Sequence, residues 1–297
     1  MPNHLPLKMT GLGEILWDLT PSGPQLGGAP ANFAYHTHAL GAQSYIVSRI
    51  GQDPLATQTL TKLAQLGLNT TGIQSDPNLP TGTVTVQIDP RGQPHYTIHR
   101  PVAWDAIEAT PSAKEIVRQS NAICFGTLAQ RDPRSRTALL NLIQTSPPTT
   151  LRILDVNLRQ KDFSREIIHQ SLQLANVLKI NDAELPVITA MFNLTGAPAK
   201  QLRNLASTYH LNCVALTRGA QGSLLLTQNE ISDHPGLPTQ VADTIGAGDA
   251  FTAALAIGLL SKDSLDKMSH RANTLAAYVA SQHGATPILP PNLQHQP

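Results

Sequence analysis

The stretch DTIGAGDAFTAALAIGLL, residues 243–260, places a carboxylate at the start of an apolar helix. Gly246, Ala247 and Gly248 directly precede Asp249, and most of the residues that follow are apolar. Glycines let backbone N–H groups approach a ligand without an intervening Cβ atom, and a helix N-terminus favours negative charge. This segment therefore predicts either an anion site beside an acidic residue or an ordinary helix cap.

Two common phosphate-binding motifs are missing from the chain. The pattern G-x-x-x-x-G-K-[ST] does not occur, and residues 246–251 depart from G-x-G-x-x-G because Phe251 occupies the last position. Residues 11–16, GLGEIL, depart from the same pattern at Leu16. The sequence therefore argues against a P-loop NTPase and against a dinucleotide-dependent oxidoreductase.

Composition indicates a globular protein without a nucleic-acid or membrane partner. Hydrophobic residues make up 41% of the 297 residues, which suits one large α/β domain. The formal net charge is +1 and no run of Lys or Arg occurs, so a phosphate backbone is not an expected partner. Residues 1–14 lack the features of a signal peptide. The longest uncharged apolar stretch, 253–260, is far shorter than the roughly 20 residues of a membrane span. We therefore expect a cytoplasmic protein.

Short apolar runs alternate with longer segments of helical spacing along most of the chain. We expect buried strands at 44–50, 122–127, 152–157, 177–181 and 213–217. This alternation predicts a doubly wound, mostly parallel α/β sheet with helices on both faces. Ligands bind at the carboxyl ends of such strands, where polar side chains stand in this sequence: Thr127, Asp155, Asn157, Asn181 and Thr217. The two cysteines, Cys124 and Cys213, fall inside these runs and are expected to be core residues.

Two other segments predict a second, smaller sheet. Residues 81–100 alternate between polar and apolar side chains on either side of a turn at 89–93, which is typical of a hairpin with one covered face. Residues 15–30 are extended and broken by Pro and Gly. We expect these segments to form a small β-sheet beside the main one.

The order of several motifs resembles that of the ribokinase-like (PfkB) sugar kinases, from about residue 11 to 290, and most closely the fructokinase branch. The two longest matches are GGAPAN at 27–32 and DTIGAGDAF at 243–251. Between them lie DVNLR at 155–159, KINDAEL at 179–185 and LTRGAQG at 216–222. The resemblance implies a single kinase domain over 1–297, with a lid formed by about 15–30 and 81–104, that uses ATP and Mg²⁺.

The resemblance also implies roles for residues of the two longest motifs. Asp249 would take the proton from a sugar hydroxyl as that hydroxyl attacks ATP, and the amides of Gly246, Ala247 and Gly248 would hold the transferring phosphoryl group. The sugar would be held by residues from three segments: Asp18, Gly27, Gly28, Asn32 and Arg159. From the residues alone, Asp18 could instead start a turn, Asn32 could be a solvated residue of a first helical turn, and Arg159 could be a solvated residue at a strand end.

Two further groups of residues carry over from the family. Residues expected to organise Mg²⁺ and the nucleotide are Asn181, Glu184, Thr217, Gly219, Gly222 and Asn273. The spacing of Asn181 and Glu184 is also that of a capping box, and both readings can hold together. Many relatives hold a monovalent cation, which would be K⁺ here, at positions that correspond to Asp243, Ala280 and Gly284.

We expect the acceptor to be the primary hydroxyl of a neutral sugar, with fructose converted to fructose 6-phosphate. Ribose, a nucleoside or 2-keto-3-deoxygluconate is the alternative, although Ala29 stands where ribokinases tend to have Lys. A non-catalytic sugar sensor on the same fold is a further alternative, which the presence of Asp249 disfavours. A phosphorylated acceptor would need cations near the glycine loop, and Arg49, Arg91 and Arg100 are the ones that could reach it. A homodimer formed through the lid is also expected from the resemblance.

Overall fold

A computed structural model describes residues 6–20, 23–88 and 94–294. The expected turn at 89–93, with Arg91, lies outside the described residues.

Nine strands form the main sheet, in the order β13-β12-β11-β10-β9-β8-β1-β4-β5. Their bounds are β1 (Lys8–Leu12), β4 (Gln43–Ile50), β5 (Ile73–Ser75), β8 (Ala122–Phe125), β9 (Leu151–Asp155), β10 (Val177–Asn181), β11 (Cys213–Thr217), β12 (Ser223–Thr227) and β13 (Ile231–His234). All neighbouring pairs from β5 to β11 are parallel, and β12 and β13 add antiparallel strands at one edge. The predicted fold class is confirmed.

Two expected strands end earlier than the sequence suggested. β8 stops at Phe125 because Thr127 adopts helical backbone angles before a short 3₁₀ turn, Leu128–Gln130. β9 stops at Asp155 and is followed by Asn157, whose φ of 45° is incompatible with a strand. Polar residues therefore lie just beyond the carboxyl ends of these strands.

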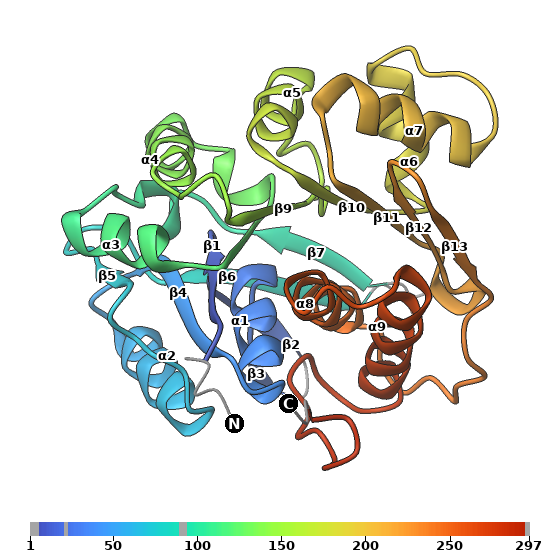
Figure 1. Ribbon diagram of the computed structural model, residues 1–297. Helices are drawn as coiled ribbons and strands as arrows, with labels where there is room; N and C mark the ends of the chain where they lie inside the picture. The colour runs from blue at the N-terminus through green and yellow to red at the C-terminus, as the bar shows by residue number, and fades with distance from the viewer. Residues whose placement is uncertain (1–5, 21–22, 89–93, 295–297) are drawn as a thin grey trace.

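Helices cover both faces of the main sheet (Figure 1). One face carries α1 (Ala29–Ala39), α2 (Pro54–Gln65), α8 (Ala247–Leu260) and α9 (Leu265–Ala280). The other face carries α3 (Pro111–Gln119), α4 (Pro133–Gln144), α5 (Arg165–Leu174), α6 (Glu184–Met191) and α7 (Pro198–Tyr209). Successive strand residues alternate between the two cores, so that Cys124 and Cys213 pack toward α8 and α9 as buried free thiols.

Side-chain caps define the start of several helices but not of α8. Asp53 accepts a hydrogen bond from the Ala56 N–H at the start of α2, and Ser264 accepts one from the Lys267 N–H at the start of α9. The residue before α8 is Gly246, which offers no side chain. The first N–H groups of α8 therefore receive no cap from this residue.

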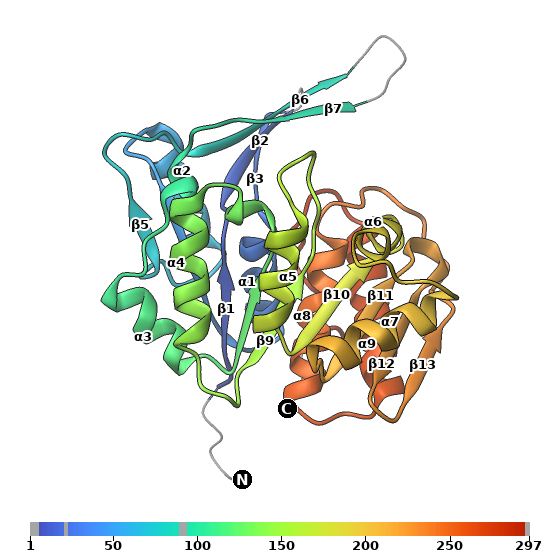
Figure 2. The ribbon, with the colours of Figure 1, turned by 90° about the horizontal axis from the view of Figure 1, so that it is seen from above.

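A second sheet of four strands projects from the main body (Figure 2). Its order is β3-β2-β6-β7, with β2 (Leu16–Thr20), β3 (Gly23–Gly27), β6 (Gly82–Ile88) and β7 (Pro94–Ile98). β2 begins four residues after β1 ends, so the sheet stands at the carboxyl ends of the main strands. We call these four strands the lid. No helix in the described parts of the chain is long and apolar enough to cross a membrane.

Candidate active site

The loop before α8 has a backbone shape that requires glycine. Gly246 has a φ of 77°, and a Cβ atom there would lie 2.5 Å from the carbonyl oxygen of Ala285. The closing loop that contains Ala285 is itself held by α1. The imidazole Nε2 of His36 lies 2.9 Å from the Ala285 oxygen, and the Tyr35 hydroxyl donates to the Pro287 carbonyl at 2.8 Å. Contacts from α1 therefore help to set the position of Gly246.

Asp249 lies on the first turn of α8 and contacts the other signature motif. Its Oδ2 atom accepts a hydrogen bond from Asn32 Nδ2 at 2.8 Å. Asn32 sits in the first turn of α1, where its N–H donates to the carbonyl of Gly28 at 3.0 Å. The two motifs that carried the family resemblance therefore meet in space, at the carboxylate expected to act as the base.

The surroundings of Asp249 favour a base that can hold a proton near neutral pH. Burial and, next, the negative charge of Asp155 raise the pKa of Asp249 to about 7. The hydrogen bond from Asn32 and the positive charges of Lys179 and Arg159 oppose this rise in pKa. A carboxyl group with such a pKa is well matched to accept a proton from a hydroxyl at physiological pH.

The expected sugar residues gather at the junction of the lid and the main sheet. Asp18 lies on β2, and burial raises the pKa of its carboxyl group while the charge of Arg159 opposes the rise. A Cβ atom on Gly27, in the neighbouring strand β3, would lie 2.7 Å from Asp18 Oδ2. Glycine at position 27 therefore leaves the space that the Asp18 carboxylate occupies.

Arg159 is exposed on the loop that follows β9. Its charge lowers the pKa values of Asp18, Asp249 and Glu14 against the effect of burial, which places it within electrostatic reach of all three carboxyl groups. The next residue, Gln160, donates from Nε2 to the carbonyl of Tyr96 on β7 at 2.7 Å. Arg159 is thus presented from a loop that is bonded to the lid.

Asn181 and Glu184 form the reciprocal pair that their spacing predicts. The Asn181 N–H donates to Glu184 Oε2 at 2.9 Å, and the Glu184 N–H donates to Asn181 Oδ1 at 2.8 Å. Glu184 Oε1 also accepts from the N–H of Leu158 at 2.9 Å. Each carboxylate oxygen therefore accepts one backbone N–H group and keeps a second acceptor site, to which a water molecule of a Mg²⁺ shell could donate.

The residues expected beside the nucleotide cluster around Ser223. Thr217, at the end of β11, pairs with Ser223 at the start of β12, and Gly222 directly precedes it. Asn273 on α9 donates to the Ser223 hydroxyl at 2.7 Å and to the Ser269 carbonyl at 2.8 Å. These bonds use the Asn273 amide to hold α9 against β12.

The three candidate cation residues also come together. Asp243 accepts the N–H of Gly284 on Oδ2 at 3.2 Å and the N–H of Ile245 on Oδ1 at 2.9 Å. The carbonyl of Ala280 accepts the N–H groups of Ala242 and Asp243 at 2.9 and 3.2 Å. A carboxylate and a carbonyl oxygen thus lie on linked segments, and these oxygens already accept backbone N–H groups.

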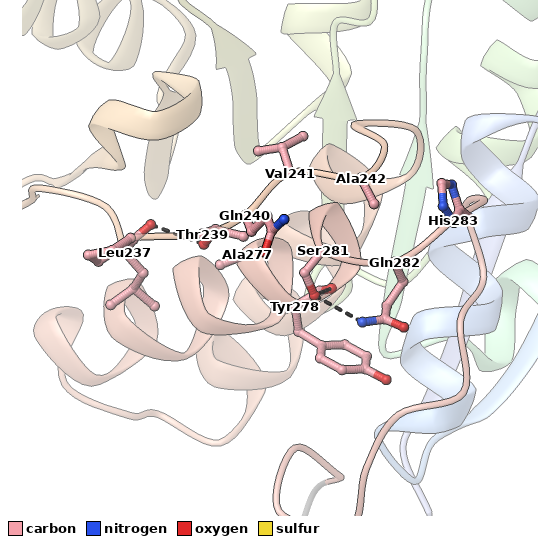
Figure 3. Close-up of a pocket in the computed structure, with 11 residues that line it drawn as sticks. Leu237, Thr239, Gln240, Val241, Ala242, Ala277, Tyr278, Ser281, Gln282 and His283 are labelled. Atoms are coloured by element: carbon pink, nitrogen blue, oxygen red, sulfur yellow. Dashed lines mark hydrogen bonds between the residues drawn. The ribbon is translucent and has the colours of Figure 1, made fainter.

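A cavity of about 780 Å³ lies beside this group of residues. Figure 3 shows the segment 237–242 on one side of it and the last turns of α9 with residues 281–283 on the other. Val241 is 57% exposed, and Tyr278 donates its hydroxyl hydrogen to the Ile288 carbonyl at 2.7 Å. We call the backbone N–H groups of Gly246, Ala247 and Gly248, which are expected to hold the phosphoryl group, the anion hole. The cavity adjoins the loop that leads to them through Ala242, which directly precedes Asp243. None of the residues expected beside the nucleotide is among the residues that line it.

The sequence matches the model of the pfkB family carbohydrate kinases over residues 24–292. The chain belongs to the PfkB carbohydrate kinase family. Its relatives include a Pyrococcus horikoshii sugar kinase, 29% identical over 87% of this chain and 82% of that protein. They also include a Klebsiella pneumoniae fructokinase, 28% identical over 95% of this chain and 96% of that protein.

Solved structures share the fold of this PfkB kinase. The Pyrococcus horikoshii sugar kinase in complex with ATP gives a TM-score of 0.80 at 26% identity and covers 94% of each chain. An Escherichia coli structure described as a ribokinase II in complex with ATP and Mg²⁺ gives a TM-score of 0.79, covers 95% of each chain, and at 20% identity shows the fold alone. The predicted family is confirmed, and relatives of this PfkB kinase bind ATP.

Sequence reasoning missed two buried charged residues of this PfkB kinase. Lys179 is 6% exposed and bonds Asp155 beneath the anion hole. Glu14 is 2% exposed, and burial raises its pKa to about 7. The signal for Lys179 was available, because a lysine inside the apolar strand VLKIN at 177–181 has to be paired or functional. The sequence around Glu14 offers no comparable signal, since GLGEIL is also compatible with an exposed turn.

Proposed function

We propose that this PfkB kinase transfers the γ-phosphoryl group of ATP to the primary hydroxyl of a neutral sugar, with fructose to fructose 6-phosphate as the preferred reaction. The observation that carries the proposal is the position of Asp249, on the first turn of α8 directly after the Gly246–Gly248 segment and hydrogen-bonded to Asn32. A non-catalytic sugar sensor would have no need of a carboxylate at this position.

The chemistry follows from the geometry around α8. The ionised Asp249 would accept the hydroxyl proton as the sugar oxygen forms its bond to the γ-phosphorus and the bond to the ADP oxygen breaks. The N–H groups of Gly246, Ala247 and Gly248 would stabilise the charge that develops on the transferred group. Mg²⁺, when bound, would neutralise charge on the phosphates, with Asn181 and Glu184 orienting its water shell.

The arginines near the lid support a neutral acceptor. Arg49 is bonded to Asp76 and Glu108, and Arg100 is bonded to Asp162. These two guanidinium groups are therefore already neutralised by carboxylates. Among the described residues, Arg159 is then the cation within electrostatic reach of Asp18. A phosphorylated acceptor would need several strong cationic contacts there, so we favour an acceptor without a phosphate group.

We propose that the four-stranded sheet closes over the sugar as a lid within a single kinase domain and that it also forms a homodimer contact. Its outer strands, β3 and β7, are edge strands in the order β3-β2-β6-β7. Leu19 and Tyr96, which belong to this sheet, are 37% and 54% exposed. Of these two residues, Tyr96 lies on an edge strand, β7, and Leu19 lies on the inner strand β2. An edge strand with an exposed aromatic side chain is suited to pairing with a second copy.

The proposed function is tested by a coupled assay of ADP release with ATP, Mg²⁺ and a panel of acceptors. The panel contains fructose, glucose, ribose, adenosine, 2-keto-3-deoxygluconate and fructose 6-phosphate. The Asp249→Asn variant, purified in the same way, controls for a contaminating kinase. We expect the highest kcat/KM with fructose and a fructose 6-phosphate product by chromatography. Absence of acceptor-dependent ADP release across the panel would contradict the proposal, and a higher kcat/KM for another neutral sugar would move the preferred acceptor to that sugar.

A further inference from the structure

Three polar side chains lie buried under the first turn of α8, outside the residues assigned above to the reaction. Lys179 Nζ donates to Asp155 Oδ1 at 3.0 Å, and both side chains are almost fully buried. The Thr252 hydroxyl lies 3.0 Å from Asp155 Oδ2 and 2.9 Å from the Gly248 carbonyl. The bonds run from β10 through β9 to the helix that carries the anion hole.

The register of the sheet directs this group toward α8. β9 and β10 are parallel neighbours in which Asp155 pairs with Lys179 and Ile153 pairs with Val177. Ile153 and Val177 belong to the core under α8 and α9, and residues two positions further along a strand point to the same face. Asp155 and Lys179 therefore replace an apolar pair at the carboxyl ends of these strands, where the sheet meets the anion hole.

The ammonium group reaches the backbone of the anion hole. A Cβ atom on Gly248 would lie 3.0 Å from Lys179 Nζ. Thr252 lies one turn further along the same helix, and its hydroxyl contacts the Gly248 carbonyl. The charged Lys179 Nζ thus lies next to Gly248, the residue that precedes Asp249.

A buried ion pair is an unexpected choice for stability alone. Removing two charges from water costs free energy that their attraction only partly restores, and well-packed apolar residues often serve as well. Its location beside Asp249, in an otherwise apolar layer, indicates a function in the chemistry.

On the basis of the proposed function, we propose that Asp155 and Lys179 are positioning residues: their buried ion pair, bonded to Thr252, holds the first turn of α8 and places one negative and one positive charge beside the base. The carboxylate of Asp155 disfavours the ionised base, whereas the ammonium of Lys179 favours it. Balance between the two charges leaves a large share of Asp249 ionised near neutral pH while keeping it basic enough to accept the sugar proton.

Several charged or titratable groups face Asp249 from the packed elements around it. They are Asp155 on β9, Lys179 on β10, Arg159 on the loop after β9, Glu14 after β1 and the Cys124 thiol on β8. Of these, Asp155 is the largest contribution from a charged group to the raised pKa of Asp249. Changing this one charge should therefore move the ionisation of the base; it also removes the charge that raises the pKa of Lys179, so Lys179 is varied separately.

The experiment measures kcat/KM for the sugar against pH at saturating ATP and Mg²⁺ for wild type and three variants. In Asp155→Asn, the amide oxygen can still accept from Lys179 and the amide nitrogen can donate to Thr252, so the bonds remain while the charge is lost. We expect the acid limb of the profile to move to lower pH by about one unit, because one repelling charge is gone. Lys179→Gln keeps a donor toward Asp155 and should move the acid limb to higher pH.

Thr252→Val is the matched control, because it breaks the bonds to Asp155 and Gly248 without changing any charge. Its acid limb should coincide with that of wild type, while kcat falls as the first turn of α8 loosens. The ionisation of ATP contributes equally to all four profiles and cancels in the comparison. Circular dichroism and the melting temperature show whether each variant is folded, and if Asp155→Asn does not fold, Lys179→Gln decides.

The outcomes separate this inference from the function on which it rests. Folded variants whose acid limbs stay at the wild-type pH, or move in the same direction, would overturn the roles of Asp155 and Lys179. If Asp249→Asn also lacks activity, the kinase assignment stands and only the positioning role fails. An Asp249→Asn variant that keeps wild-type activity and the same acid limb would instead overturn Asp249 as the base.

Discussion

Beneath the anion hole, buried polar contacts join α8 to two central strands, whereas the lid is attached by contacts at its base and has open outer edges. On the anion-hole side, Asp155 and Lys179 are 3% and 6% exposed and lie in the middle of a nine-stranded sheet. On the lid side, Tyr96 is 54% exposed on the outer strand β7. Stabilising developing charge requires groups that are already in place, while admitting a sugar requires a part that can move.

The base of the lid has its own buried ion pair. Arg131 donates to both oxygens of Asp105 at 2.8 and 2.9 Å and to the His99 carbonyl at 2.7 Å. Its guanidinium carbon lies 3.9 Å from the centre of a Trp104 ring. His99 follows β7, so this cluster ties the end of the lid to the main body. Each side therefore contains a buried ion pair, one beneath Asp249 and one at the base of the lid. We propose a role in the chemistry for the first pair and a role in attaching the lid for the second.

The largest effect is expected from removing the base on the rigid side. Asp249→Ala should lower kcat by about 10³–10⁴-fold while the KM for ATP stays within a few-fold, because in the proposed role the carboxylate would contact the reacting hydroxyl and not the nucleotide. Steady-state kinetics with both substrates varied measure this. A variant that keeps a tenth of wild-type turnover would show that the anion-hole side does not supply the base.

The lid anchor should have the next largest effect, and on stability. Arg131→Met leaves Asp105 buried without its partner, so the free energy of unfolding should fall by about 3–5 kcal/mol. Urea denaturation followed by circular dichroism measures the change. The Arg131→Met/Asp105→Asn double variant removes both charges and should recover part of the loss. Equal stability of wild type and the single variant would mean that the lid is anchored elsewhere.

A pair of glycine variants tests whether the backbone of the anion hole is rigid. Gly246→Ala would bring a Cβ atom to 2.5 Å from the Ala285 oxygen, whereas Gly41→Ala, at a φ of 92°, has nothing within 4 Å. We expect kcat of Gly246→Ala to fall by about 10²–10³-fold, the loss seen when an oxyanion donor is misplaced. Gly41→Ala carries a similar backbone strain without the clash and serves as the control. Similar kcat values for the two variants would contradict a rigid anion hole.

Asp18 tests the sugar contact where the lid meets the main sheet. Asp18→Asn replaces a charged acceptor by a neutral amide. kcat/KM for the sugar should therefore fall, by an amount that corresponds to a rise of about 1.5–3 kcal/mol in activation free energy. The KM for ATP should not change. If the ATP constant shifts and the sugar constant does not, Asp18 belongs to the nucleotide side of the site.

The smallest effect is expected from a monovalent cation. K⁺ should raise kcat about three- to tenfold over Na⁺, or roughly 1 kcal/mol, by steadying the backbone between Asp243 and Gly248 at saturating substrates. Turnover is measured in a choline background with KCl or NaCl added. Equal rates with all three cations would leave Asp243 as a cap for Ile245 and Gly284 alone.

Local patterns in the sequence predicted much of this molecule. Alternation of apolar residues predicted the parallel sheet and the hairpin of β6 and β7, and the capping-box spacing predicted the bonds between Asn181 and Glu184. Such features depend on neighbouring residues, since strand periodicity and cap geometry act over a few positions. The family resemblance added the residues around Asp249.

The tertiary structure decided which of these residues work together. Asn32 reaches Asp249 across 217 positions of sequence, and His36 fixes the loop that shapes Gly246. The apolar neighbours of Lys179 in the sequence indicate that it is buried. Its pairing with Asp155 and its position next to Gly248 follow only from strand order and register. The sequence by itself determined the fold class, the family and the candidate base, because these depend on strand periodicity and on motifs of a few consecutive residues. The charges that surround the base come from segments far apart in the chain, and only their packing against one another sets its proton affinity.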